Sequence, residues 1–160
     1  MEQDDTAGLS ATALERSSVD FAILADRAEV LNNKLYIMGG AWDTTGVIDF
    51  SKPIGFSLAI GILVPWHEAS DAHEVRMHIE GADATRITPE LQATVGVWRP
   101  PTAIKGQSFR AMLAISGQVL LPGRGSYVAV VQLGNGSSKH VVFHAVPAQQ
   151  LAAPPTSIQR

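Results

Sequence analysis

Short apolar runs separated by turn-forming residues are the feature that most constrains the fold of this chain. The runs are rich in valine, isoleucine, leucine and phenylalanine, and asparagine, glycine or proline stands between most of them. No long stretch repeats its apolar residues with the period of an amphipathic helix. We therefore predict about eight short β-strands, over residues 21–31, 35–43, 55–64, 73–80, 94–98, 108–115, 126–133 and 139–146.

Local patterns predict how some of these strands pair and face. Asn32 and Asn33 separate the first two runs, and asparagine tolerates the positive φ angles of a tight hairpin. Gly39 and Gly40 in the second run predict a bulge or a close backbone approach. Residues 73–80 alternate apolar with polar side chains, which predicts a strand with one face in the core and one in water.

Together these strands predict an all-β chain folded as a single antiparallel β-sandwich, with jelly-roll or immunoglobulin-like topology. A small closed sheet of five or six strands is the alternative. We expect the sandwich domain over residues 19–146. Residues 1–18 are expected to form an N-terminal arm, either loose or as a short helix, and the proline-rich tail 147–160 is expected to be disordered.

The composition excludes several kinds of site and partner. The 160 residues include no cysteine, which excludes disulfides, thiolate nucleophiles and cysteine-ligated metals. A formal net charge of −3 provides no basic surface for nucleic acid or for an anionic membrane. The acidic N-terminus lacks the features of a signal peptide, and no apolar run approaches the roughly 20 residues of a membrane-spanning helix. We expect a soluble cytoplasmic protein.

Residues 65–80, PWHEASDAHEVRMHIE, concentrate histidine and carboxylate side chains. His67, Glu68, Asp71 and His73 would suit zinc or manganese if they converged. However, the segment lacks the helical H-E-x-x-H spacing of a zinc site. We favour a polar turn in which Glu68 or Asp71 accepts backbone hydrogen bonds, and we predict no metal or cofactor.

The three tryptophans, Trp42, Trp66 and Trp98, lie at or near the ends of predicted strands. Aromatic side chains there commonly close the end of a sandwich. The alternative is a stacking platform for a sugar or a peptide. For Trp66, which follows Pro65, we predict an indole ring buried in the core beneath residues 67–72.

The sequence contains no recognisable catalytic arrangement. Residues 123–127 lack the lysine of a phosphate-binding loop, and no G-x-S-x-G motif occurs. His140 and His144 share one face of a predicted strand at a separation of about 13 Å. We therefore predict that they pair with neighbouring strands and do not share an ion.

Four segments together carry a resemblance: NKLYIMGGAWD (33–43), PIGFSLAIGILVPWHEASDAH (53–73), GVWRPP (96–101) and LLPGRGSYVAVVQLGNG (120–136). They resemble a family of small, uncharacterised bacterial domains, many from actinobacteria. Its members carry a G-K-L…G-G-x-W hairpin, a P-W-x-E-x-N-x-x-H loop, an R-P-P turn and an L-P-x-G-x-Y hairpin. Lys34, Leu35, Gly39, Gly40, Trp42, Pro65, Trp66, Glu68 and His73 match these motifs. Ser70 replaces the asparagine of the loop, and Asn33 replaces the usual glycine of the hairpin.

We expect a non-enzymatic interaction or assembly module of a bacterial cell, which binds a protein partner or a second copy of itself. A small-molecule or carbohydrate receptor is the first alternative, and a metal-dependent enzyme is the second. The candidate ligand or partner surface consists of Trp42, Trp66, His67, Glu68, Asp71, His73 and Trp98.

Overall fold

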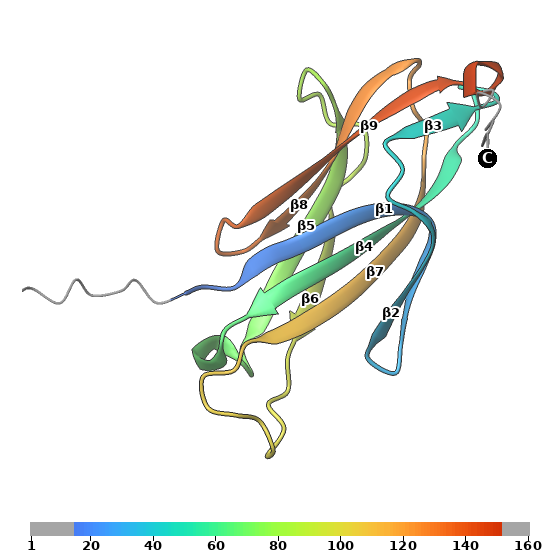
Figure 1. Cartoon of the computed structure of the whole chain (residues 1–160). Helices are drawn as coiled ribbons and strands as arrows, with labels where there is room; N and C mark the ends of the chain where they lie inside the picture. The colour runs from blue at the N-terminus through green and yellow to red at the C-terminus, as the bar shows by residue number, and fades with distance from the viewer. Residues whose placement is uncertain (1–14, 152–160) are drawn as a thin grey trace, which may run out of the picture.

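A computed structural model describes residues 15–151, which fold into two β-sheets packed face to face (Figure 1). The strands are β1 (Ser18–Leu31), β2 (Lys34–Gly40), β3 (Thr44–Val47), β4 (Ile54–Val64), β5 (Ala72–Gly81), β6 (Leu91–Gly96), β7 (Phe109–Val119), β8 (Gly125–Leu133) and β9 (Ser138–Pro147). Two short 3-10 turns, η1 (Trp66–Glu68) and η2 (Ala148–Leu151), follow β4 and β9. The predicted all-β sandwich is therefore confirmed at the level of its two-sheet architecture.

The two sheets have the strand orders β2-β1-β4-β7 (sheet A) and β3-β9-β8-β5-β6 (sheet B). All neighbours are antiparallel except β3 and β9, which run parallel, so the prediction of a purely antiparallel sandwich is wrong. β3 is also absent from the eight predicted strands. Its four residues, Thr-Thr-Gly-Val, have too weak a pattern to predict a strand, and they are extended because β9 supplies the pairing.

The core lies between β4 of sheet A and β5, β8 and β9 of sheet B. Phe56, Leu58, Ile60, Ile62 and Val64 project from β4 into it and are buried. β4 is buried along most of its length because β1 and β7 flank it on both sides. The third predicted strand is therefore an interior strand of sheet A.

β5 shows the predicted alternation. Val75, Met77 and Ile79 are at most 2% exposed, and the side chains between them face away from the core. The polar half of the segment 65–80 therefore divides between the η1 turn and the outer face of sheet B.

The β1–β2 hairpin turns at Asn32 (φ 49°) and Asn33 (φ 58°), as predicted. Gly39 has a φ of 57°, and a Cβ atom there would lie 2.1 Å from Oδ2 of Asp26. The close neighbour is the side chain of Asp26 on the paired strand, and the β1–β2 register has no shift at this point. β1 and β2 both contact β7 although β4 lies between β1 and β7 in the sheet, so the hairpin bends back over sheet A (Figure 1).

The ends of the described region are held by the sandwich. β1 begins at Ser18, within the segment predicted as an arm, and η2 places Leu151 beside Gly46 of β3. The rest of the predicted arm, residues 1–14, and residues 152–160 of the predicted tail lie outside the described residues. Within residues 15–151, no helix is long and apolar enough to cross a membrane.

Candidate functional site

One side of the sandwich, between β6 and β7, is open. β6 is the last strand of sheet B and β7 is the last strand of sheet A, and the two do not pair with each other. At eleven residues, β7 is the longest of the four edge strands, because β2, β3 and β6 have seven, four and six residues. We call the space between β6 and β7 the open side.

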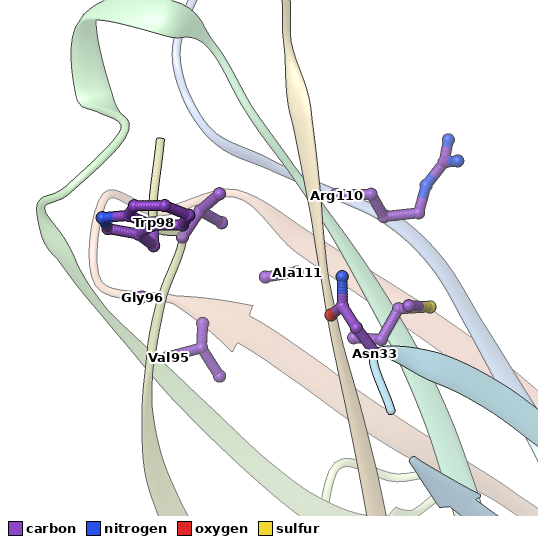
Figure 2. A pocket seen from close by; sticks show the side chains of 8 residues that line it. Asn33, Val95, Gly96, Trp98, Arg110 and Ala111 are labelled. Atoms are coloured by element: carbon purple, nitrogen blue, oxygen red, sulfur yellow. The ribbon is translucent and has the colours of Figure 1, made fainter. Parts of the chain in front are cut away.

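A cavity of about 410 Å³ lies at one end of the open side. It is lined by Asn33, Val95, Gly96, Val97, Trp98, Arg110, Ala111 and Met112. In Figure 2, Trp98 lies on one side of β7, and Asn33 and Arg110 lie on the other. The tip of the β1–β2 hairpin and the end of β6 thus flank the first part of the β7 edge.

A smaller cavity of about 110 Å³ lies at the other end of the open side. The residues that line it come from β4, from β5, from the segment before β6 and its first residue, and from the end of β7. They are Phe56, Met77, Thr88, Pro89, Leu91, Gly117 and Gln118. Phe56 and Met77 belong to the core, so this cavity reaches the space between the sheets. The open side therefore has a hollow at each end.

Along the open side, side chains that face the core remain half-exposed. Leu113 and Ile115 of β7 and Val95 of β6 pack against the core but are only partly buried, and Leu91 is 46% exposed. Their counterparts on β4 are fully buried. The open side thus exposes apolar surface that the interior strands cover elsewhere.

The edge of β7 has little of the protection that natural edge strands carry. Proteins commonly block such edges with charged side chains, proline or very short strands. β7 has no proline, and Arg110 is its single charged residue, at the second position. Arg110 is itself paired, since its Nη2 lies 2.7 Å from Oδ2 of Asp20 on β1. The remaining edge offers unpaired backbone groups to an additional strand.

The η1 turn closes the same end of the sandwich. The Trp66 ring lies between the Phe109 ring, with centroids 6.1 Å apart, and the Arg99 guanidinium, whose Cζ is 4.5 Å from the ring centroid. Trp66 is half-buried, so the prediction of a ring buried in the core is wrong in extent. The Arg99 side chain covers the face of the Trp66 ring that we expected residues 67–72 to cover. Arg99 also donates a hydrogen bond to the Ala69 carbonyl at 3.3 Å.

Glu68 anchors the start of β1. Its Oε2 accepts hydrogen bonds from the Ser17 backbone N–H, at 2.9 Å, and from the Ser17 hydroxyl. Its Oε1 lies 3.8 Å from both Arg16 Nε and His67 Nε2. The hydrogen bond from the Ser17 hydroxyl is the main cause that lowers the pKa of this carboxyl below its ordinary value. Glu68 therefore accepts backbone hydrogen bonds from a distant segment and not from its own turn.

The other predicted site residues are dispersed. His73 Nε2 bonds to the Glu68 carbonyl at 3.2 Å, whereas Asp71 is exposed at the turn. Trp98 is 74% exposed at the open side, and Trp42 packs edge-on against Phe143 at 5.8 Å. In residues 15–151, no three histidine or carboxylate side chains are placed to hold a metal ion.

The three tryptophans therefore contact three different surroundings and form no common platform. Trp42 packs on the core, Trp66 packs under Arg99, and Trp98 lines the open side. The predicted cross-strand role of the strand histidines is confirmed for His144, whose Nδ1 lies 2.9 Å from Ser126 Oγ on β8.

Sequence reasoning missed the open side itself, including Arg110 and the β7 edge. The signal present in the sequence is an eleven-residue strand with a single charge and no proline. That signal has meaning only once the strand order shows that β7 is an edge.

The profile of a family of unknown function, DUF6941, matches residues 20–146. Among proteins with curated descriptions, none matches this chain. The predicted resemblance is thus confirmed as far as an uncharacterised domain family, over nearly the expected residues 19–146. Its bacterial origin stays a prediction. The chain belongs to the DUF6941 family of unknown function.

Proposed function

We propose that this domain is a non-enzymatic protein-interaction module of a bacterial cell, in which the open side accepts an extended segment of protein. The segment would add to β7 as a further antiparallel strand. In this binding mode, backbone hydrogen bonds provide affinity and alternate side chains provide specificity. One observation carries the proposal. β7 is an eleven-residue edge strand with little protection, and its core-facing residues Leu113 and Ile115 are only partly buried.

We also assign the sandwich to the immunoglobulin-like topology and not to the jelly roll. The order β1-β4-β7 opposite β9-β8-β5-β6 corresponds to strands A-B-E opposite G-F-C-C′. Tyr127, the third residue of β8, supports the assignment, because its hydroxyl donates a hydrogen bond of 2.6 Å to the Gly123 carbonyl in the turn before β8. Immunoglobulin-like domains carry such a tyrosine corner near the start of strand F. Sandwiches of this kind serve widely as interaction domains, which is an analogy of fold only.

A receptor for a small molecule is the second candidate function. The cavity beside Trp98 favours it, since about 410 Å³ falls in the range of about 300–1,000 Å³ typical of ligand pockets. Strand addition has the stronger support, because the exposed apolar surface continues along β7 well beyond this cavity. Trp98 fluorescence against a metabolite collection, with Trp98→Phe as the silent control, tests the receptor.

A display of random peptides, long enough to cover β7 and selected on the full chain, tests strand addition. We expect selected peptides to protect the β7 amides from hydrogen exchange. We also expect Leu91→Asp to weaken their binding about tenfold or more, as a charge in an apolar interface does. Ile48→Asp is the matched control, because Ile48 is 86% exposed and lies outside the open side.

Peptides that bind Leu91→Asp and Trp98→Ala as tightly as the unmodified chain would contradict the proposal. The same conclusion follows if the peptides protect strands other than β6 and β7.

A further inference from the structure

The β1–β2 hairpin extends beyond the pairing of sheet A. β4 pairs with β1 only as far as Ala25, so the rest of β1 has β2 as its single pairing partner. A two-stranded hairpin is marginally stable in water unless another part of the protein covers it. We propose that the outer face of the hairpin, residues 26–40, binds the same face of a second copy of the chain, so that two molecules form a symmetric dimer.

One face of the hairpin packs on the molecule, and the other is open to solvent. Ala28 is 7% exposed, and Val30 and Leu35, which share its face, are partly buried. The opposite face carries Tyr36 and Met38, which are 49% and 55% exposed. Large apolar side chains that gather on one exposed face commonly mark an interaction site. The outer face of the hairpin therefore has the character of an uncovered interface.

Four side chains on the outer face form a two-by-two array. In the β1–β2 register, Glu29 lies opposite Tyr36, and Arg27 lies opposite Met38. Directly opposed residues share a face, and so do residues two apart on one strand. A hollow of about 160 Å³ is lined by these four residues together with Ile37. The array thus has a charged column on β1 and an apolar column on β2, with space among them for a partner's side chains.

This array is complementary to an inverted copy of itself. A two-fold axis that crosses both strands between the two rows places Glu29 against Arg27 of the second copy, and Tyr36 against Met38 of the second copy. A symmetric dimer uses the same patch on both subunits, so the patch has to be complementary to itself. Opposite charges and a thioether against an aromatic ring are both favourable contacts. Charge complementarity therefore points to a second copy as the partner.

The two charged side chains are available for this contact. Arg27 Nη2 lies 3.4 Å from Oε2 of Glu29 on the same strand, and the two side chains are 64% and 41% exposed. An exposed pair of this kind is weak, and the guanidinium has several further N–H donors for a second carboxylate. The face is much smaller than the roughly 800 Å² that each partner buries in a standard interface, so we expect a weak dimer that depends on concentration.

Charge reversal followed by mixing tests the contact on the full chain. In the dimer, Arg27→Glu would place carboxylates against carboxylates, and Glu29→Arg would place guanidiniums against guanidiniums. Each variant alone should therefore dimerise about tenfold more weakly or worse. An equimolar mixture of the two should associate like the unmodified chain, because every charge again meets its opposite. Sedimentation up to about 1 mM protein measures this range of affinity.

Lys52→Glu is the matched control, because it makes the same change of charge at another exposed ion pair, with Asp49, outside the hairpin. The control should dimerise like the unmodified chain. Restored association in the mixture also shows that both charge-reversed variants are folded.

An unmodified chain that is monomeric at every concentration would overturn the inference, and so would charge-reversed variants that dimerise normally. A mixture that stays monomeric would overturn it as well, because the two charges would then not face each other. The outer face of the hairpin is separate from the open side, and the inference does not rest on the proposed function. Peptides selected on the open side would still test that function after each of these results.

Discussion

At Ser70 the backbone has a φ of 86°, a region that side chains other than glycine and asparagine rarely adopt. The residue ends the η1 turn, and its N–H donates to the Val97 carbonyl at 3.0 Å, which joins the turn to the segment after β6. The asparagine expected at this position from the family resemblance has a physical reason: its short polar side chain relieves part of this strain.

We predict that Ser70→Asn stabilises the domain by about 0.5–1 kcal/mol, because it reduces the cost of the left-handed conformation. Calorimetric melting should show a rise of a few degrees. Ser108→Asn, in a loop of ordinary φ, is the control and should have no effect. A lower melting temperature for Ser70→Asn would show that the serine hydroxyl matters more than the strain.

The hydrogen bonds of Glu68 predict that the free energy of unfolding depends on pH in the acidic range. Its pKa is lowered in the folded state, mainly by the Ser17 hydroxyl, so its contribution is complete above the unfolded value of about 4.3. The contribution is lost as the pH falls through the folded pKa. We expect Glu68→Gln to destabilise the chain at pH 7 by about 1–2 kcal/mol, as loss of hydrogen bonds to a charged group does.

Urea titrations at pH 7 and at pH 3 check the Glu68 prediction. The difference between the unmodified chain and Glu68→Gln should shrink at the lower pH. An equal difference at both values would mean that packing of the side chain, and not its charge, holds Ser17.

Among the elements, the η1 turn contains Trp66, which packs at the end of the sandwich, together with His67 and Glu68 of the polar segment 65–80. Trp66 is covered by Arg99 and Phe109 rather than buried, so Trp66→Ala should destabilise by about 2 kcal/mol, below the 3–5 kcal/mol of a fully buried tryptophan. His67→Ala and Asp71→Ala should stay within about 0.5 kcal/mol. Thermal melts of the three variants check this, and a larger loss for His67→Ala than for Trp66→Ala would contradict it.

How far each element could be predicted depended on where its determinants lie. The β1–β2 hairpin and the alternation of β5 have local causes, namely two asparagines and a period of two, so their sequences predicted them. β3 has a distant cause, because Thr44–Val47 pairs with residues 144–147. Trp66 was correctly predicted to pack at the end of a strand, but the residue that covers its ring was not predicted. That residue is Arg99, which lies more than thirty residues further along the chain.

For the whole molecule, the position of each strand in the sheet order decides which surface is available. No local pattern marks β7 as an edge, so the candidate site could not be predicted beyond Trp98. The tryptophans and the 65–80 cluster were predicted to form one surface because of their residue types, but the fold places the tryptophans in separate surroundings.

We predict that Gln118→Lys, a charge placed at an exposed position of β7, lowers self-association and heat-induced aggregation. Its stability should change by no more than about 0.5 kcal/mol. Gln132→Lys adds the same charge at an exposed position of β8, an interior strand, and serves as the control. Light scattering during heating measures the effect, and equal aggregation of both variants would show that the β7 edge is not the route.

The parallel pairing of β3 with β9 has a consequence for how the chain folds as it is made. β3 leaves the ribosome about 100 residues before its partner, which corresponds to about 5–20 s at usual rates of synthesis. Sheet A can assemble once β7 has emerged, whereas β8 and β9 are the last strands to arrive. During that interval the inner face of sheet A lacks most of its cover, so a nascent chain stalled before residue 125 should bind chaperones more strongly than the finished one.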